Sequence, residues 1–358
     1  MSLQAEYGEV ALAAWERYKS FSPFRSYCSI LAMTGAARLG KIIGSEALLD
    51  DVRGCLRPFL AGKVEKVGGS YGATVYRFGG NAAAWLLVRG LLPEAKDVMV
   101  ASAELLCRNY PRDVDGCFGK SEAMPSFIWI DTVFGVCPFL LWTGKAASRR
   151  DFIDESVLQM LRHHDRLFDP VLKLYHQASN ARGSGCLTPA HWSRGVGWGL
   201  LALAELVYDL PKEHPGYEKI LTAYRQVLEG CLATQDSDGM WHQAMEAPDS
   251  YVESSGSALI LYAIGRGLKN GSIDRERFLG PYMRGLRGLS RYVAIDGSVF
   301  NACCGCLAPG AGTVADYAAH PHKLNDEHSS GPVIYAFSQA EQLRQKGAIP
   351  PLAELLRG

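Results

Sequence analysis

Apolar residues recur at three- and four-residue intervals through much of this 358-residue chain, and this spacing constrains the fold more than any other feature. The interval matches the turn of an α-helix, whereas few runs alternate as β-strands do. No linker rich in Pro and Ser, no block of like charge and no low-complexity stretch divides the chain. We therefore expect one mostly helical domain over residues 1–358. The expected helices cover residues 11–18, 45–60, 81–92, 96–109, 130–142, 197–208, 217–233 and 254–268.

A turn signal followed by an aromatic residue recurs along the chain. It contains Asp-Gly at 113–118, 236–241 and 295–300, and turn signals at 68–71 and 168–175 hold comparable positions. A spacing of roughly 50 to 65 residues is enough for one helical hairpin with its loops. Six such hairpins closed in a ring form an all-α (α/α)6 barrel, and we predict this fold with the turns on one rim around a central pocket. The alternative is that Asp-Gly turns, which are common, recur here by chance.

The charge balance excludes several classes of partner. Lys and Arg number 37, as do Asp and Glu, so no net charge attracts nucleic acid or an anionic membrane. No uncharged apolar run reaches the length of about 18 residues needed for a membrane helix. Residues 1–20 contain acids and no apolar core of a secretion signal. The ten cysteines lack regular disulfide spacing, so we expect them to be reduced and the protein to be cytoplasmic.

Asp131 is the main catalytic candidate because it interrupts an otherwise apolar run at 127–142. An acid in such a setting is either paired for structure or held partly desolvated for proton transfer. Flanking by Trp129 and Phe134 predicts a raised pKa, which suits a general acid. The simpler alternative is an acid at a helix N-terminus that complements the helix dipole.

A cation stands between two aromatic residues in the segment 192–198. Trp192, Arg194 and Trp198 fall within two helical turns, and Arg194 and Trp198 share one helical face. Aromatic rings stack on the C–H face of a sugar, and a guanidinium binds a carboxylate. The cluster therefore indicates an acidic sugar, although a cation–π pair at a helix end would look the same.

Two further residues are weaker candidates for a sugar site. His176 follows Tyr175 in a turn-like region, 45 residues after Asp131. Lys120 follows an Asp-Gly turn and could bind an anion. Taken singly, each would usually be a structural or surface residue.

Two clusters raise the question of a metal site. Cys303, Cys304 and Cys306 stand too close together for a tetrahedral site of four cysteines, and no second pair matches them. The second cluster consists of potential ligands near the C-terminal end that lack the HExxH arrangement; its members are His320, His322, Asp326 and His328. A dinucleotide-like match at 310–315 follows no expected strand. We expect no metal and no cofactor.

Together these motifs resemble the unsaturated rhamnogalacturonyl hydrolases, glycoside hydrolase family 105, to which the unsaturated glucuronyl hydrolases are related. The resemblance runs in family order from about residue 115 to the C-terminal end. Its most specific parts are the Trp-x-Arg-Gly-x-Gly-Trp segment and the Asp-to-His distance. The matching segments are 118–120, 129–131, 174–176, 192–198, 251–255 and 325–328.

The resemblance implies an (α/α)6 barrel, no metal, and Asp131 as general acid/base. The implied reaction removes a 4,5-unsaturated uronic acid from the non-reducing end of oligosaccharides that a lyase has released from pectin or rhamnogalacturonan. The acid protonates C4 and helps to deliver water to C5. The matching segments also hold the residues that we expect to bind the substrate, namely His176, Arg194, Trp198, Trp129, Trp192 and Lys120.

The chain departs from the family at one position. The family usually carries a second catalytic-site Asp roughly 55 residues before the first, but here no Asp or Glu occurs between Glu65 and Glu94. One interpretation is that Asp113 or Asp115 replaces it. Others are that this member works without it, with Arg77 or Asn81 contacting the sugar, or that the chain is inactive.

Two other functions are compatible with the same barrel. A sugar epimerase or isomerase would use paired histidines facing the pocket, and His242 and His328 are the candidates. A sugar-binding relative without activity would explain the missing acid.

Overall fold

The computed structural model describes residues 6–64, 76, 78–120, 124–307 and 312–357, and helices dominate this part of the chain. The strands are short and occur in three antiparallel pairs, β1 with β4, β2 with β3 and β5 with β6. The helices are α1 (Tyr7–Phe21), α2 (Tyr27–Ile43), α3 (Glu46–Leu60), α5 (Gly80–Val88), α6 (Lys96–Asn109), α7 (Asp131–Ala147), α8 (Arg150–Leu167), α9 (Ser193–Asp209), α10 (Tyr217–Thr234), α11 (Ser254–Asn270), α12 (Arg275–Ser290), α13 (Val314–Ala319), α14 (Ser330–Gln345) and α15 (Leu352–Leu355), with a short 3-10 helix at Pro93–Ala95. The strands are β1 (Ile128–Trp129), β2 (Phe168–Asp169), β3 (Leu174–Tyr175), β4 (Ala178–Ser179), β5 (Ala302–Cys303) and β6 (His322–Lys323).

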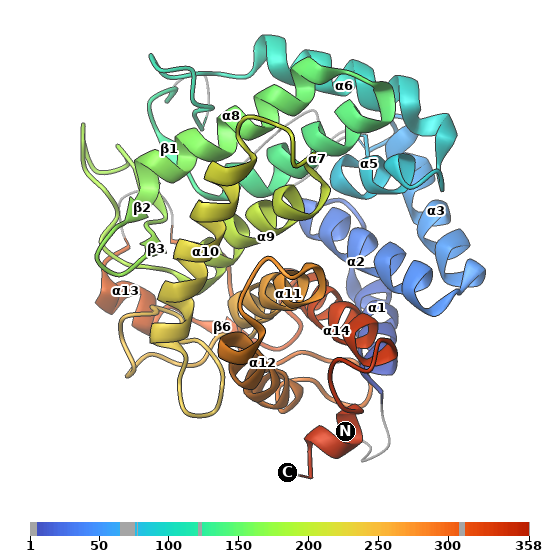
Figure 1. The fold of residues 1–358 in the computed structure, drawn as a ribbon, viewed down its shortest axis with the longest axis vertical. Helices are drawn as coiled ribbons and strands as arrows, with labels where there is room; N and C mark the ends of the chain where they lie inside the picture. The colour runs from blue at the N-terminus through green and yellow to red at the C-terminus, as the bar shows by residue number, and fades with distance from the viewer. Residues whose placement is uncertain (1–5, 65–75, 77, 121–123, 308–311, 358) are drawn as a thin grey trace.

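The long helices form two concentric rings (Figure 1). In the described part of the chain, α2, α5, α7, α9, α11 and α14 contact one another in this order and close an inner ring. Each inner helix packs against an outer partner, in the order α3, α6, α8, α10, α12 and α1. This arrangement is the predicted (α/α)6 barrel.

The two ends of the described chain complete the barrel together. Helix α1 packs along α14, so the sixth hairpin is made from segments far apart in sequence. The Tyr7 hydroxyl donates to the Pro350 carbonyl at 3.1 Å, and the Gly8 amide donates to Glu341 Oε2 at 3.3 Å. None of the described helices is both long and apolar enough to cross a membrane.

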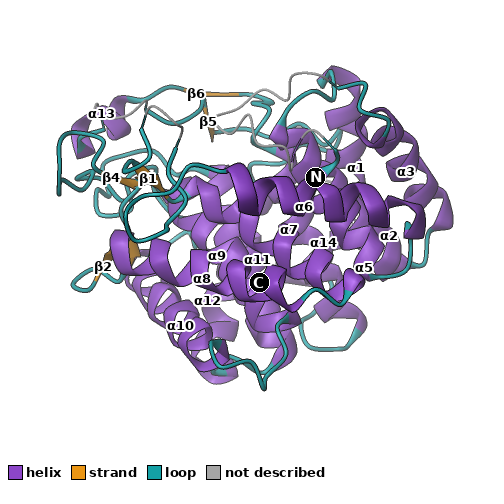
Figure 2. Ribbon diagram, turned by 90° about the horizontal axis from the view of Figure 1, so that it is seen from above, coloured by secondary structure: helices purple, strands orange, loops and turns teal. Residues whose placement is uncertain are grey.

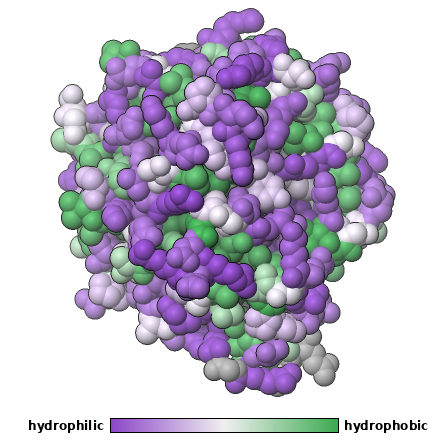
Figure 3. Space-filling view, viewed as in Figure 1, coloured by the Kyte–Doolittle hydropathy of each residue, from purple (hydrophilic) through white to green (hydrophobic). Residues whose placement is uncertain are grey.

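Burial explains which helices lie inside. Every residue of α7 from Asp131 to Gly144 is buried, and α9 and α11 are buried almost throughout. A helix that is apolar on all sides belongs in a core. The outer helices α3 and α8 bury one stripe and expose the other. Hydrophilic side chains therefore cover most of the face seen along the barrel axis (Figure 3).

The recurring turns form equivalent structures on one rim. Gly116, Gly239 and Gly297 adopt positive φ of +78°, +86° and +79°, a conformation that glycine tolerates best. In each turn an Asp side chain accepts hydrogen bonds from later backbone amides. These turns join an outer helix to the segment leading to the next inner helix, and Figure 2 shows most loops gathered at that end. The expected turn at 68–71 lies outside the described residues.

The periodicity predicted the positions of eight helices, but four long helices were missed. Helix α2 is apolar almost all round, whereas α14 buries polar residues such as Gln339 and Glu341 among its apolar ones. Helix α8 is rich in charge, and α12 contains Pro281 and several glycines. Helices α8 and α12 nevertheless bury an apolar stripe each, so the helical pattern is present in them and their charged or helix-breaking residues obscure it.

Glycines let the inner helices approach closely at the rim. A Cβ on Gly256 of α11 would lie 2.6 Å from the backbone nitrogen of Arg194 in α9. Backbone atoms cannot move aside cheaply, so this contact fixes how the first turns of α9 and α11 meet. By contrast, a Cβ on Gly54 of α3 would meet nothing within 4 Å.

This contrast predicts opposite effects for two glycine-to-alanine substitutions. Gly256→Ala should destabilise the protein by about 1–3 kcal/mol, because it overpacks a helix contact. Gly54→Ala should be neutral or stabilise by up to about 1 kcal/mol, since alanine is the better helix former. Thermal or urea unfolding of both variants measures the difference. Equal stabilities would contradict the close approach of α9 and α11.

Candidate active site

The inner helices present their N-terminal ends to the same rim. Asp131 begins α7 and Arg194 is the second residue of α9. Tyr27 begins α2, Ser255 lies in the first turn of α11, and His328 precedes α14. The N-terminus of a helix carries partial positive charge and free amide groups, so the convergence of these ends favours an anionic ligand.

Asp131 is an acid held in a nearly dry position. Asp131 is only 8% exposed, and its Oδ2 has no hydrogen-bond partner among the described residues. Burial raises the pKa of this carboxyl to about 7, while the charge of Arg194, a hydrogen bond from Trp129 and the charge of Lys120 lower it in part. The carboxyl can therefore exchange a proton near neutral pH, as the apolar flanks in the sequence predicted.

Arg194 is a buried cation with unused hydrogen-bonding capacity. The residue is 0% exposed, and its Nη1 donates to Ser255 Oγ at 3.1 Å and to the Cys303 carbonyl at 2.9 Å. Its Nε and Nη2 have no hydrogen-bond partner among the described residues. The guanidinium carbon lies 4.7 Å from the centre of the Trp192 ring. A buried cation with free donors is suited to an anion that brings its own acceptors.

Aromatic side chains enclose these two charges. Trp198 stacks on Phe134 at 4.3 Å between ring centres and meets Tyr27 edge-on at 6.4 Å. Trp192 stacks on Tyr317 at 5.8 Å. Trp198 is only 1% exposed, so one of its faces is already covered by protein.

Lys120 lies on the same side of the site as Asp131. Its Nζ is 4.5 Å from the Trp129 ring and 4.9 Å from the Phe127 ring. Partial burial lowers the pKa of Lys120, and the charge of Asp131 opposes this effect. Of the residues that the sequence singled out, the structure thus brings together Asp131, Arg194 and Lys120 with the three tryptophans.

Tyr27 and Tyr317 were not predicted from sequence. The Tyr27 hydroxyl lies 2.6 Å from Nε2 of His328, and Tyr317 hydrogen-bonds to Gln177. Burial raises the pKa of both tyrosines, and the charge of Asp131 raises it further. No spacing in the sequence links these residues to Asp131, since they come from opposite ends of the chain.

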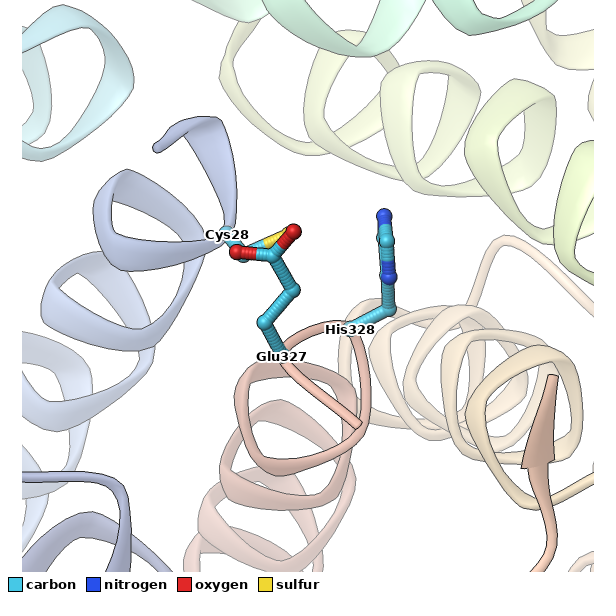
Figure 4. A group of neighbouring side chains, drawn as sticks. All are labelled: Cys28, Glu327 and His328. Carbon is cyan, nitrogen blue, oxygen red and sulfur yellow. The ribbon is translucent and has the colours of Figure 1, made fainter. Parts of the chain in front are cut away.

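His328 belongs to a hydrogen-bonded group that could resemble a metal site. Figure 4 shows its ring beside Cys28 and the Glu327 carboxylate, and the potential ligand atoms lie within 4.8 Å of one another. However, Nδ1 of His328 lies 2.5 Å from Asp326 Oδ1, and Nε2 is engaged by Tyr27. Because both ring nitrogens have hydrogen-bond partners, this group does not fit a metal ion.

His176 lies in a different cluster from the other candidates. Its Nδ1 is 2.7 Å from the Thr188 carbonyl, and its Nε2 is 3.9 Å from Asp169 Oδ2. Its ring stands 4.5 Å from the ring of His191. Contact between His176 and the sugar therefore stays a prediction.

The substitutes considered for the missing second acid have other partners. Asp113 and Asp115 both pair with Arg166 of α8. The Asn81 amide donates to the Phe134 carbonyl at 2.8 Å and so ties α5 to α7. Arg77 lies outside the described residues. The carboxylates of Asp113 and Asp115 thus stabilise a turn through their ion pairs with Arg166.

The histidines of the epimerase alternative sit in separate surroundings. Nδ1 of His242 contacts the Ser250 carbonyl, and Nε2 faces Asp236 Oδ2 at 3.6 Å. His328 lies beside Tyr27 instead. Within the described ranges, no hydrogen bond or ring contact joins the two histidines.

A cavity lies where the inner helices end. It has a volume of about 440 Å³ and is lined by Arg38, Tyr262 and Arg266, among others. Behind it, the buried Glu205 carboxylate pairs with Arg38 at 2.6 Å and Arg266 at 3.3 Å. Asp131 is absent from its lining, so this cavity is separate from the candidate active site.

The sequence is similar to those of known glycoside hydrolases. The sequence model of the family described as Glycosyl Hydrolase Family 88 matches residues 90–344. The unsaturated rhamnogalacturonyl hydrolase YesR of Bacillus subtilis (strain 168) is 33% identical over 167 residues, which cover 45% of this chain and 48% of YesR. An unsaturated 3S-rhamnoglycuronyl hydrolase of Alteromonas sp. (strain LOR) is 30% identical over 179 residues, or 48% of this chain and 42% of that protein. The chain thus matches less than half the length of these curated relatives.

Solved structures share the fold. A family 105 glycoside hydrolase of C. acetobutylicum ATCC 824 superposes with a TM-score of 0.82 at 20% identity, covering 94% of this chain and 99% of that one. The unsaturated glucuronyl hydrolase of Bacillus sp. GL1 superposes with a TM-score of 0.70 at 14% identity, covering 96% and 97%. These superpositions confirm the barrel predicted from the sequence.

The buried state of Asp131 predicts a specific dependence of stability on pH. The folded protein keeps the Asp131 proton up to about pH 7, whereas the unfolded chain loses it near the ordinary pKa of 3.8. Over this window the unfolded state binds fewer protons, so this carboxyl makes the wild type less stable as pH rises. Asp131→Asn removes the effect and should gain up to about 4 kcal/mol relative to wild type between pH 4 and pH 7, at about 1.36 kcal/mol per pKa unit.

Urea unfolding of both proteins across this pH range measures the difference, and Asp97→Asn on the exposed face of α6 controls for the loss of a carboxyl. A stability difference that stays constant with pH would show that Asp131 is ionised in the folded protein.

Proposed function

This chain belongs to Glycosyl Hydrolase Family 88, and from this premise we propose that it removes a 4,5-unsaturated uronic acid from the non-reducing end of oligosaccharides released by a polysaccharide lyase. The observation that carries the proposal is Asp131, a nearly dry acid with a pKa of about 7 placed near a buried arginine. Such a carboxyl can donate a proton at neutral pH, whereas an exposed Asp cannot.

The reaction follows from the chemistry of the unsaturated ring. Asp131 gives its proton to C4 of the C4–C5 double bond, which leaves positive charge at C5 and the ring oxygen. Water adds to C5, and the Asp131 carboxylate takes the released proton. The resulting hemiketal opens and the anomeric carbon expels the neighbouring sugar as a free alcohol.

In this scheme one carboxyl acts first as acid and then as base, so the protons balance without a second carboxylate. The carboxyl-separation rule for retaining and inverting glycosidases therefore does not apply. The absence of an acid between Glu65 and Glu94 is compatible with activity. A double-displacement mechanism, which needs a separate nucleophile, would not tolerate it.

Arg194 is the proposed partner of the uronate carboxylate. Its free Nε and Nη2 offer the paired donors that a carboxylate accepts, and the helix N-termini around it add to the attraction. Lys120 adds a second positive charge near Asp131. We propose that Trp129, Trp192 and Trp198 bound the sugar subsite, and that Trp198 acts mainly by holding Phe134 in place.

The leaving sugar is proposed from the relatives. YesR is named as a rhamnogalacturonyl hydrolase, and the Alteromonas protein as acting on rhamnoglycuronyl substrates. We therefore propose pectic or rhamnogalacturonan oligosaccharides as the substrate class.

All ten cysteines are free in the described structure, which supports a reducing, cytoplasmic location. The closure of the ring by α1 and α14 supports residues 1–358 acting as one domain.

Replacing Asp131 tests the catalytic role directly. Asp131→Asn keeps the shape of the side chain but can neither donate an acid proton nor act as base. We expect it to bind substrate and to lose about 10²- to 10⁴-fold in kcat, the usual contribution of a general acid or base. The assay follows the loss of ultraviolet absorbance of the unsaturated uronide in lyase digests of pectin, rhamnogalacturonan and glycosaminoglycan. Asp115→Asn, in the Arg166 turn, should keep wild-type kcat.

Three other results would redirect the proposal. Equal turnover by Asp131→Asn and wild type would remove Asp131 from catalysis. Binding without turnover by the wild type would identify a sugar-binding relative. Epimer exchange of a free sugar, with no change in uronide absorbance, would favour the epimerase alternative.

Arg194 allows the effect of its charge to be separated from that of its shape. The positive charge of Arg194 lowers the pKa of Asp131. Arg194→Gln should therefore raise that pKa and move the alkaline limb of the pH–rate profile to higher pH, because the protonated acid is the active form. Arg194→Lys keeps the charge but loses the planar fork, so its limb should stay close to that of wild type while KM rises. If both variants move the limb equally, the charge of Arg194 does not act on Asp131.

A further inference from the structure

We propose that Asp169, His176 and His191 bind one divalent transition-metal ion on the rim beside the active site. The three residues come from the turn after α8 and from the segment that leads into α9. One ligand atom from each lies within 4.8 Å of the others. Two imidazoles and one carboxylate form a recognised donor set for such ions. This inference departs from the sequence-based expectation of no metal.

The donor atoms face one another at distances close to those of a metal site. Nε2 of His191 is 3.3 Å from Asp169 Oδ2, and Nε2 of His176 is 3.9 Å from the same oxygen. Tetrahedral coordination with bonds of about 2.0–2.2 Å places neighbouring ligand atoms roughly 3.3 Å apart. One pair already has this separation, and the other, at 3.9 Å, would have to shorten by about 0.6 Å to reach it.

Another group holds the far side of each ligand, as hydrogen-bonding partners hold the ligands in known metal sites. Nδ1 of His176 is bound to the Thr188 carbonyl at 2.7 Å, which leaves Nε2 with a free lone pair. Oδ1 of Asp169 accepts the amides of Val171 at 2.7 Å and Leu172 at 3.2 Å, which leaves Oδ2 free. The protein thus orients both ligands before any ion arrives.

His191 is buried between two carboxylates. The residue is 3% exposed, and its Nε2 faces Asp169 Oδ2 at 3.3 Å. Nδ1 lies 3.3 Å from Glu246 Oε1, and that oxygen already accepts the His191 backbone amide at 3.0 Å. Glu246 can fix the ring through Nδ1, so Nε2 points to the proposed ion.

The charge around the cluster favours a cation. Asp169 and Glu246 bring two carboxylates, and in the described part of the chain neither forms an ion pair with a lysine or arginine. The two imidazole rings stand 4.5 Å apart, so protonating both is unfavourable. A divalent ion would neutralise the carboxylates without charging either ring.

A similar pair elsewhere in the barrel shows what the third ligand adds. In the turn after α10, Nε2 of His242 faces Asp236 Oδ2 at 3.6 Å, and its Nδ1 contacts a backbone carbonyl. An Asp–His pair is therefore a recurring feature of these turns and does not by itself indicate a metal. Only the turn after α8 has a further histidine, His191, close enough to complete a group of three ligands within the described residues.

The proposed ion would cross-link two segments that carry active-site residues. His176 immediately precedes Gln177, which binds Tyr317, and His191 lies three residues before Arg194. The half-buried Asp169 and His176 leave a route for the ion from solvent. The ligand set favours Zn²⁺, Co²⁺ or Fe²⁺ over Ca²⁺ and Mg²⁺, which prefer oxygen ligands.

The test uses the full chain without an affinity tag, stripped of metal with a chelator. Co²⁺ is titrated by calorimetry and by visible absorbance, followed by competition with Zn²⁺ and with Mg²⁺. Thermal unfolding with and without each ion gives a second readout, since an ion that binds only the folded state raises Tm. Asp169→Asn and His176→Gln remove one ligand each. Asp236→Asn and His242→Gln are the matched controls.

We expect one Co²⁺ per chain, displaced by Zn²⁺ but not by Mg²⁺, and a metal-dependent rise in Tm. Losing a group that only hydrogen-bonds to a metal ligand costs roughly 10- to 100-fold in metal affinity, and each ligand variant should lose more than that. The controls should bind as the wild type does. The proposal is overturned if the wild type binds no Co²⁺, if the ligand variants bind it unchanged, or if thiolate-to-cobalt charge-transfer absorption shows that cysteines hold the ion. Because these readouts do not use turnover, they are independent of the proposed hydrolase activity.

Discussion

The parallel direction of the six inner helices in the described barrel determines where charge can be placed at either end. Their N-terminal ends meet at one rim, and the partial positive charge there favours the ionised form of an acid. Asp131 nevertheless holds its proton to about pH 7, because desolvation outweighs the helix ends and the cation Arg194. At the opposite end the dipoles reverse, and Lys41 and Lys269 stand in the last turns of α2 and α11. The barrel is therefore polarised along its axis before any substrate binds.

Burial of Arg194 is the clearest cost in this arrangement. A buried guanidinium is expensive unless its donors are satisfied, and only Nη1 makes hydrogen bonds in the described structure. The uronate of the proposed substrate would supply the missing acceptors and balance the charge. The site is thus left incomplete in a way that an anionic ligand corrects. If a protein carboxylate formed a salt bridge with Arg194, it would occupy the free donors of the guanidinium. An anionic sugar would then have no free donors to bind there.

The sequence predicted the fold through its apolar periodicity and its recurring turns, and it missed four long helices. Burial on all sides does not explain these misses, since α7, α9 and α11 are buried almost throughout and were predicted. Helices α2 and α14 were missed although they supply Tyr27 and the residues beside His328. Asp131 and Arg194 could be found because an acid in an apolar run and a cation between tryptophans are visible locally. Tyr317 could not be found in this way. It reaches the site through tertiary contacts such as those with Gln177 and Trp192.

The recurring turns explain how one barrel can carry different chemistry around its rim. Each turn joins an outer helix to the next inner helix, and an Asp side chain fixes its backbone, as at Asp113, Asp169 and Asp236. The second carboxylate oxygen then remains free for a partner from a neighbouring segment. At Asp113 that partner is Arg166, which makes an ordinary ion pair. At Asp169 it is a pair of histidines, which offer lone pairs as well as protons. The same local solution for folding a turn therefore produces a structural salt bridge at one position and a potential ligand set at another, according to which side chain the next segment brings.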